Sequence, residues 1–244
     1  MKGLLSHFFV TALILSPFAS YAQPATTITS IPFFITQPGK YILQSDLTTL
    51  SSSDGISVGA SGVTIDLNGF SIISTARPNS AAGVRASGVT DVRILNGVIS
   101  GFAVAVDINS LPSATGSGYL IDNVRASVLD EGIIYRGCKD SVIQNCTISK
   151  DNLSRFGDAA GIRLFRCRGI RVLKNTVTAG ASSFVRYPVG IFSGTSNGSY
   201  FEDDYVVNCQ TGLSLSTPDK YRAITTQDCV VGIEGGTDVG SESN

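Results

Sequence analysis

Apolar and polar residues alternate along short stretches of this chain, and the alternation restarts roughly every 20 to 30 residues. The pattern is clear in Gly55–Val58 (GISV) and Val63–Asn68 (VTIDLN), and it returns in Gly83–Ala86 (GVRA) and Val92–Asn96 (VRILN). Because successive side chains of a strand point to opposite faces, the alternation predicts short strands that are buried on one side. No helical period separates them, which disfavours a layered βαβ fold.

A glycine and an asparagine recur at nearly fixed spacing through these units. The glycines are Gly55, Gly83, Gly132, Gly161 and Gly190, with a looser pair at Gly212 and Gly232. The second marker follows thirteen residues later at Asn68, Asn96 and Asn145, and fourteen residues later at Asn175 and Asp204. A degenerate unit has Ala103 in the glycine position and Asn123 as its second marker. Such a period predicts stacked copies of one unit.

Steric chemistry explains both markers. Glycine has no Cβ and fits where the backbone turns sharply, and asparagine tolerates the left-handed region that a tight bend requires. We therefore expect the second markers to form one structural ladder: Asn68, Asn96, Asn123, Asn145, Asn175 and Asp204. A β-sandwich would leave the fixed spacing without a cause.

The G-[IV]-x-[VL] and [VI]-x-[IL]-x-N units between Gly55 and Gly236 resemble those of right-handed parallel β-helix repeat proteins, the pectate-lyase-like superfold and its NosD-like periplasmic relatives. The resemblance implies an all-β, single-stranded solenoid of about seven or eight coils, with a β-helix at 55–236. Residues 23–54 are expected to form an N-terminal β cap that hides an open strand edge. A flexible tail is expected at 237–244.

The N-terminus has the features of a signal peptide. Lys2 precedes an apolar stretch from Leu4 to Leu15, and Ser20-Tyr21-Ala22 offers a cleavage pattern. We predict removal of residues 1–22 and export to the periplasm or the extracellular space, without an integral membrane segment. A buried N-terminal helix or a retained anchor is the alternative.

Composition narrows the chemistry. Without Lys2 the formal charge is 17 − 19 = −2, which disfavours a nucleic-acid partner. Removal of residues 1–22 also removes the only histidine, so a zinc site and a histidine-dependent hydrolase are disfavoured. We expect no metal and no cofactor, except Ca²⁺ if the protein is a lyase.

Five cysteines leave at least one thiol unpaired. Cys138 and Cys167 each lie six residues after the glycine of neighbouring units, so stacking would bring them within range of a disulfide. The alternative is that the cysteines are small buried apolar residues.

The second and fourth residues after each glycine are expected to point outward, where enzymes of the resembled superfold bind polysaccharide. The second-residue row is Ser57, Arg85, Ala105, Ile134, Arg163, Phe192, Ser214 and Glu234, and the fourth-residue row includes Asp107, Arg136 and Phe165. With the loop residues Phe184, Arg186 and Tyr187, we take as ligand-binding candidates Arg85, Arg136, Arg163, Phe165 and Phe192.

Plain structural readings compete with these candidates. Asp107 and Arg136 could be a surface ion pair, and Arg163, Arg166, Arg168 and Arg171 could simply solvate one coil. As carboxylates of a glycosidase, Asp107 and Glu234 would lie five coils apart, or roughly 24 Å, which is too far to cooperate.

The sequence favours binding of an extended polysaccharide over catalysis. If the protein is an enzyme, a polysaccharide lyase or uronate epimerase is favoured over a hydrolase. The catalytic candidates are then Arg155 or Arg186 as base, near Asp151 and Asp158. A non-catalytic surface scaffold or adhesin-like protein is the third hypothesis.

Overall fold

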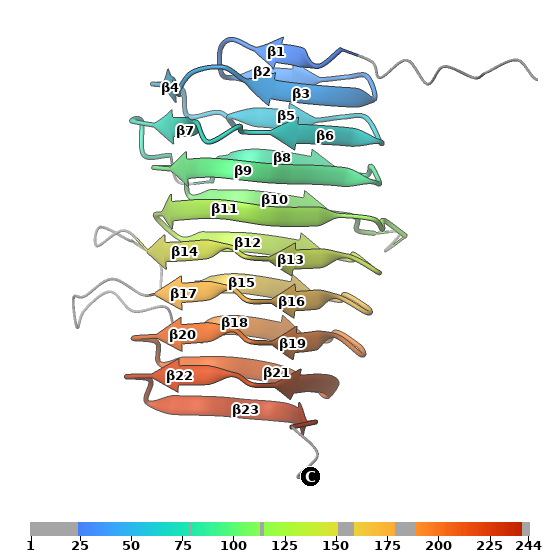
Figure 1. Ribbon diagram of the computed structural model, residues 1–244, viewed down its shortest axis with the longest axis vertical. Helices are drawn as coiled ribbons and strands as arrows, with labels where there is room; N and C mark the ends of the chain where they lie inside the picture. The colour runs from blue at the N-terminus through green and yellow to red at the C-terminus, as the bar shows by residue number, and fades with distance from the viewer. Residues whose placement is uncertain (1–23, 79, 113–114, 151–158, 179–188, 241–244) are drawn as a thin grey trace, which may run out of the picture.

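A computed structural model describes residues 24–78, 80–112, 115–150, 159–178 and 189–240, and within these ranges the chain forms strands and no helix. The strands wind into coils, and each complete coil contributes to three sheets (Figure 1). Every strand pairing is parallel. The prediction of an all-β parallel β-helix is confirmed.

Sheet 1 holds β2 (Phe33–Ile35), β5 (Ile56–Val58), β8 (Ala82–Ser87), β10 (Val104–Asn109), β12 (Glu131–Arg136), β15 (Ala160–Phe165), β18 (Val189–Gly194) and the first parts of β21 (Thr211–Arg222) and β23 (Val231–Asp238). Sheet 2 holds β1 (Thr26–Ile28), β3 (Gly39–Leu43), β6 (Val63–Asp66), β13 (Val142–Gln144), β16 (Arg171–Leu173), β19 (Tyr200–Glu202), the first parts of β9 (Val92–Ser100) and β11 (Leu120–Val128), and the last parts of β21 and β23. Sheet 3 holds β4 (Leu47–Thr49), β7 (Ser71–Ser74), β14 (Thr147–Lys150), β17 (Thr176–Thr178), β20 (Tyr205–Val207), β22 (Thr225–Gln227) and the last parts of β9 and β11.

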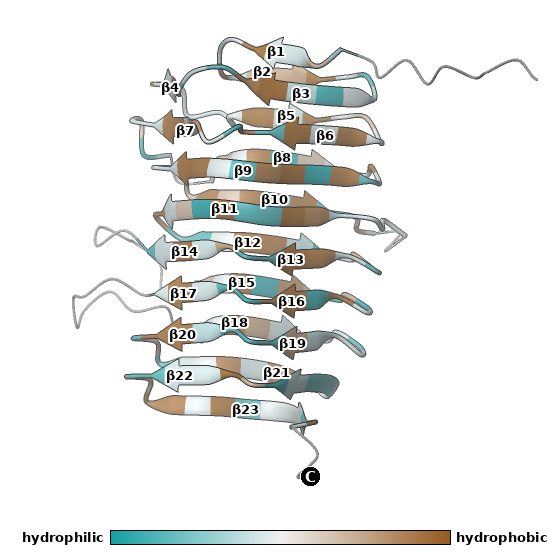
Figure 2. Cartoon of the chain, in the orientation of Figure 1, coloured by the Kyte–Doolittle hydropathy of each residue, from teal (hydrophilic) through white to brown (hydrophobic). Residues whose placement is uncertain are grey.

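The core fills the inside of this three-sided prism. Ile56, Val84, Val106, Ile133 and Ile162 stand in register on successive strands of sheet 1, and each is fully or almost fully buried. Apolar segments alternate with polar ones along all three sheets (Figure 2). Identical or similar apolar side chains thus stack from coil to coil, which removes their surface from water.

The glycine column follows the repeat. An added Cβ at Gly132 would lie 2.2 Å from the carbonyl oxygen of Gly161, and one at Gly83 would lie 2.2 Å from Cγ2 of Ile99. In the degenerate unit, however, Val106 pairs with Val84, so Ala105 and not Ala103 occupies the glycine position. The expected position was two residues too early because Ala103-Val104 and Ala105-Val106 both match the start of the unit, and the strand pairing selects the second.

The asparagine ladder is two columns, not one. Asn68, Asn96, Asn123 and Asn145 adopt left-handed backbone conformations with φ of 53° to 55°, as expected for a tight bend. The register of β13 and β16 places Lys174, with φ 57°, after Asn145 in this column. Asn175 and Asp204 lie one residue further on, stack on Cys146 and point into the core. The change in spacing from thirteen to fourteen residues was the sign of this shift.

Within each column, hydrogen bonds that involve the asparagine side chains link neighbouring coils. Nδ2 of Asn123 donates to Oδ1 of Asn96 over 3.1 Å at the surface. In the buried column, the backbone N–H and Nδ2 of Asn175 both donate to Oδ1 of Asp204, over 2.8 and 3.0 Å. Oδ1 of Asn175 in turn accepts a bond from the backbone N–H of Cys146. Such bonds satisfy polar groups at the bend that would otherwise be buried without partners.

The two ends of the helix extend the repeat. In the region expected as a cap, β2, β3 and β4 pair in register with β5, β6 and β7 and so form a first coil, which β1 covers only at β3. At the other end, β23 reaches Asp238, two residues into the expected tail. The expected signal peptide lies outside the described residues. Across the described part of the chain there is no helix of the length and hydropathy needed to cross a membrane.

Cys138 and Cys167, for which the sequence left a disulfide and separate buried thiols open, are free thiols in this structure. The two residues do stack on adjacent coils, and each thiol donates to backbone carbonyl oxygens, among them those of Ile108 for Cys138 and Tyr135 for Cys167. Both are almost completely buried, as are Cys146 and Cys209. They fill the interior as small apolar side chains.

Candidate functional site

The outward face of sheet 1 carries a continuous row of side chains. Its aligned positions are Ser57, Arg85, Asp107, Ile134, Arg163, Phe192, Ser214 and Glu234. Asp107 therefore belongs to the row that was expected to contain Ala105, and Ala105 is buried. The same two-residue shift that moves the glycine position causes this correction. Arg136 and Phe165 lie two residues further along their strands, in the neighbouring row.

Asp107 joins two arginines of this face. One carboxylate oxygen accepts from Arg85 and the other from Arg136, and the Asp107 side chain is only 4% exposed. Arg85 also contacts Asp54, whose Oδ2 lies 2.7 Å from Nε of the guanidinium. The pair of Asp107 and Arg136 thus exists, as part of a network in which the Asp107 carboxylate is buried and both guanidiniums are half-buried. A network of this kind fixes the side chains in place.

A second group surrounds Arg163. Its Nε donates to Oε1 of Glu131, and its guanidinium carbon lies 5.1 Å from the centre of the Phe192 ring on the next coil. That ring lies along its own strand over Gly194, where an added Cβ would come within 2.4 Å of a ring carbon. The arginine is therefore held from one side by a carboxylate and rests on an aromatic ring on the other.

Two more charged groups lie beside Glu131. Burial raises the pKa of Glu131 and of Asp130, although the cations of Arg163 and Lys150 oppose the shift. Burial also lowers the pKa of Lys150, which is 4% exposed at the end of β14. Carboxyls with raised pKa next to an amine with lowered pKa are a common feature of functional sites.

A family model described as the right handed beta helix region matches residues 39–231. The chain belongs to this family. The match covers most of this β-helix protein and gives the hand of its coil, as the sequence units predicted. It is a match of fold and assigns no ligand.

Two solved structures are similar to this β-helix protein in fold alone. An alginate lyase from Paenibacillus sp. str. FPU-7 has 10% sequence identity and a TM-score of 0.48, with 83% of this chain and 91% of that chain covered. PfbA, a surface adhesin of Streptococcus pneumoniae, has 10% identity and a TM-score of 0.39, with 89% and 80% covered. No curated protein matches the chain.

The structure brings together some of the predicted site residues and not others. Arg85 and Arg136 meet at Asp107, and Arg163 meets Phe192, whereas Phe165 contacts the exposed Arg166, whose guanidinium carbon lies 5.2 Å from the ring centre. The remaining candidates lie outside the described residues: Asp151, Arg155, Asp158, Phe184, Arg186 and Tyr187. Among the described residues, no group of three or more His, Cys, Asp or Glu side chains has metal-binding geometry.

Sequence reasoning missed the acidic partners of these arginines. Asp54 and Glu131 each directly precede a column glycine, and each pairs with an arginine two residues after the glycine of the next coil on sheet 1. The recurring signal is therefore [DE]-G in one unit and G-x-R in the unit that stacks on it. Only the glycines of this signal carried the prediction from the sequence, because the residues after each glycine were compared and not the residue before it.

Two hollows lined by described residues lie away from the Arg163 group. A cavity of about 190 Å³ lies at the N-terminal end of sheet 1 and is lined by Phe34, Ser57, Arg85 and Ser87, among others. A larger one of about 630 Å³ opens near the C-terminal end, between Glu202, Tyr221, Ile233 and Asp238. On the outward face of sheet 1, Ile134 is buried in a small apolar cluster with Ala82, Ala103 and Val104, whereas the Arg85, Arg136 and Arg163 side chains are half-buried.

Proposed function

We propose that this protein is exported and binds an extended polysaccharide on the outward face of sheet 1, with Arg163 and Phe192 at the centre of the contact. The observation that carries the proposal is the arrangement of Glu131, Arg163 and Phe192. The planar guanidinium rests on the ring and keeps a fixed direction, while the Arg163 side chain stays 24% exposed. A preorganised polar plane beside an aromatic ring fits the flat faces and hydroxyl groups of sugars, because little side-chain entropy is lost on binding.

The charge balance of this face indicates the kind of contact. Each of the three guanidiniums on it, from Arg85, Arg136 and Arg163, is paired with a carboxylate. The face therefore offers directed donors and acceptors with little net charge. We infer that the bound glycan is recognised through its hydroxyl groups and ring faces, so that its affinity depends only weakly on salt.

The double variant Arg163→Ala/Phe192→Ala tests this site. We expect it to weaken the binding of polysaccharides identified on a glycan array by about tenfold or more, since it removes both halves of the stacked pair. Isothermal titration at low and high salt would measure the affinity. The control is Arg93→Ala/Arg125→Ala, which removes two exposed arginines from sheets 2 and 3. Unchanged array binding by the Arg163/Phe192 variant would overturn the placement.

A second function, polysaccharide lyase or uronate epimerase, is favoured by Asp130, Glu131 and Lys150. Burial shifts the pKa of each toward its uncharged form, so two carboxyls and an amine whose protonated and neutral forms suit proton transfer lie near one another. Incubation with uronate polymers would distinguish this function. A lyase would form an unsaturated product that absorbs ultraviolet light. If this absorbance appears with the unsubstituted protein and is lost in Lys150→Met, the protein is a lyase and not only a glycan-binding protein.

A further inference from the structure

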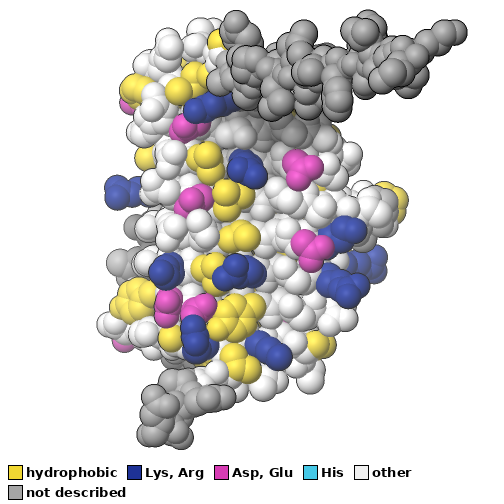
Figure 3. Space-filling view, turned by 45° about the vertical axis from the view of Figure 1, so that its right-hand side comes forward, with side chains coloured by type: hydrophobic (Ala, Val, Ile, Leu, Met, Phe, Trp, Pro, Cys, Tyr) yellow, Lys and Arg dark blue, Asp and Glu magenta, His cyan; other side chains and the backbone are white. Residues whose placement is uncertain are grey.

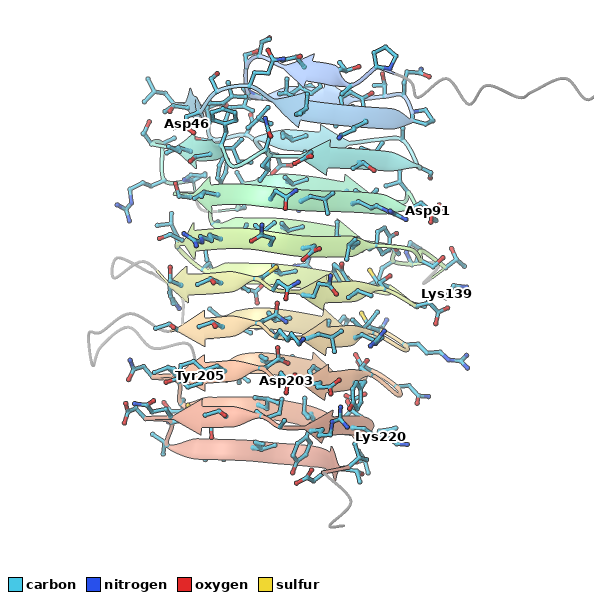
Figure 4. All side chains as sticks on the ribbon, in the orientation of Figure 1. Asp46, Asp91, Lys139, Asp203, Tyr205 and Lys220 are labelled. Atoms are coloured by element: carbon cyan, nitrogen blue, oxygen red, sulfur yellow. The ribbon has the colours of Figure 1, made fainter. Side chains whose placement is uncertain are left out.

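The turns between sheets 1 and 2 carry a group of basic side chains that the proposed glycan face does not use. Lys139 follows β12, and Arg166 and Arg168 follow β15, with Arg171 at the start of β16. We call these four residues the basic corner. Lys139 and Arg168 stand in register on neighbouring coils. Figure 3 shows basic side chains gathered at mid-height on the right of the molecule, and Figure 4 shows Lys139 extending away from the sheets there.

The basic corner differs from sheet 1 in its charge balance. Within the described ranges none of its four cations forms an ion pair, whereas Arg85, Arg136 and Arg163 on sheet 1 all do. The carboxylate of Asp140 is the acidic group between them, and its Oδ1 lies beside Gly169. Arg166, Arg168 and Arg171 are exposed. Four cations and one carboxylate leave a local charge of about +3 on two coils, in a protein whose overall charge is near zero.

The backbone at Arg166 explains how its side chain comes to lie at the corner. Arg166 has φ 54°, and the residues stacked on it, Gly137 in the preceding coil and Thr195 in the next, also have positive φ, of 66° and 52°. The left-handed bend is thus a regular feature of this column, and at Arg166 it carries an exposed cation.

We propose that the basic corner binds an anionic polysaccharide, one that carries carboxylate or sulfate groups along its chain. Arginine forms paired hydrogen bonds with such groups, and neighbouring coils about 4.8 Å apart present cations repeatedly to a polymer. The site lies beside the proposed glycan face but differs from it in chemistry, because its cations form no ion pair with the acidic residues that the structure describes.

Two other polyanions fit the described surface less well. Binding of single-stranded nucleic acid relies on aromatic side chains that stack with bases, and insertion into a membrane relies on exposed apolar side chains. The exposed large apolar residues among those described are Phe34, Leu50, Tyr205, Val230, Val231 and Val239, and none of them lies in the basic corner.

The test measures binding of the full chain to polygalacturonate, heparin, a single-stranded DNA oligonucleotide and phosphatidylserine vesicles at several salt concentrations. We expect Arg168→Ala/Arg171→Ala to weaken binding of polygalacturonate or heparin by about tenfold at low salt, and to reduce the slope of log affinity against log salt by about the two lost charges. The matched control, Arg93→Ala/Arg125→Ala, removes the same charge from other exposed positions and should stay within about twofold. Arg166→Asn, which removes a cation from a residue type that tolerates this backbone conformation, should act in the same direction as the corner variant.

Three results would overturn the proposal. Equal losses in the corner variant and its control would mean that the charge acts diffusely. Tighter binding to DNA or to vesicles than to both glycans would give the wrong partner class, and absence of binding to either glycan would remove the site. The Arg163→Ala/Phe192→Ala variant separates this site from the proposed function, since it should leave the salt-dependent binding at the corner unchanged.

Discussion

At the scale of single residues, one carboxyl group stands out because it replaces an amide inside the core. Asp204 stacks on Asn175, is 1% exposed, and has no described hydrogen-bond partner for Oδ2. Burial raises its pKa to about 7, and the neighbouring charges of Asp203 and Glu202 act in the same direction, against the hydrogen bonds donated by Asn175. In the folded protein the Asp204 side chain is therefore mostly protonated below about pH 7.

This raised pKa predicts the pH dependence of one variant. Between about pH 4 and pH 7 an unfolded chain releases the proton that folded Asp204 keeps, so stability falls as pH rises and the loss is complete above pH 7. We expect Asp204→Asn to raise the free energy of unfolding by about 1–3 kcal/mol at pH 8 and to change it little at pH 4, measured by urea denaturation. The unsubstituted protein, measured in the same buffers, is the control. A loss of stability that is equal at both pH values would contradict this account.

At the scale of the strand, the glycine column explains why the units begin as they do. A Cβ at Gly132 would meet the backbone of the next coil at 2.2 Å and Cγ2 of Ile148 at 2.4 Å. Ala105 stands in the same column and is fully buried. Whether a position in this column requires glycine thus depends on which atoms of the neighbouring coils lie next to it, and not on its place in the repeat alone.

A pair of substitutions tests this local requirement. We expect Gly132→Ala to destabilise the protein by about 2–4 kcal/mol, because neither the backbone of the next coil nor a buried isoleucine can move aside easily. Ala105→Gly should cost about 1 kcal/mol, since it removes one methyl group and adds backbone freedom. The midpoints of chemical denaturation would measure both. Equal and small effects would show that the column tolerates a Cβ throughout.

At the scale of the whole molecule, each coil contacts mainly the coils before and after it, so stability is distributed along the axis. The middle coils are buried from both sides. At the C-terminal end, β22 and β23 have mostly exposed or half-buried residues, and Val230 and Val231 are exposed. The last coil therefore has fewer interactions to lose on opening.

Hydrogen exchange would detect this gradient. We expect amides of β22 and β23 to exchange at least tenfold faster than those of β12 and β15, because local opening is easiest where the buried contacts are fewest. Mass spectrometry of exchanged peptides gives the comparison within one sample, and the central strands act as the internal reference. Uniform protection along the axis would mean that the coils open only together.

The sequence by itself determined the coil. The alternation of apolar residues, the glycine at each strand start and the left-handed residue at each bend are local steric requirements, and local requirements can be read from single units. Asn68, Asn96, Asn123 and Asn145 were placed correctly for this reason. The same reading failed at Asn175 and Asp204, where one added residue moves the marker from the surface bend into the core.

Only the tertiary structure decided which side chains of neighbouring coils come into contact. The register around the degenerate unit brings Asp107 between Arg85 and Arg136, and the stacking of β12 on β15 brings Glu131 to Arg163. Loops of variable length hide these pairings from a count along the chain. The pKa of Asp204 and the lack of ion pairs between the basic corner and the described acidic residues are decided in the same way, because burial and charge compensation depend on neighbours that lie twenty to thirty residues away in the sequence.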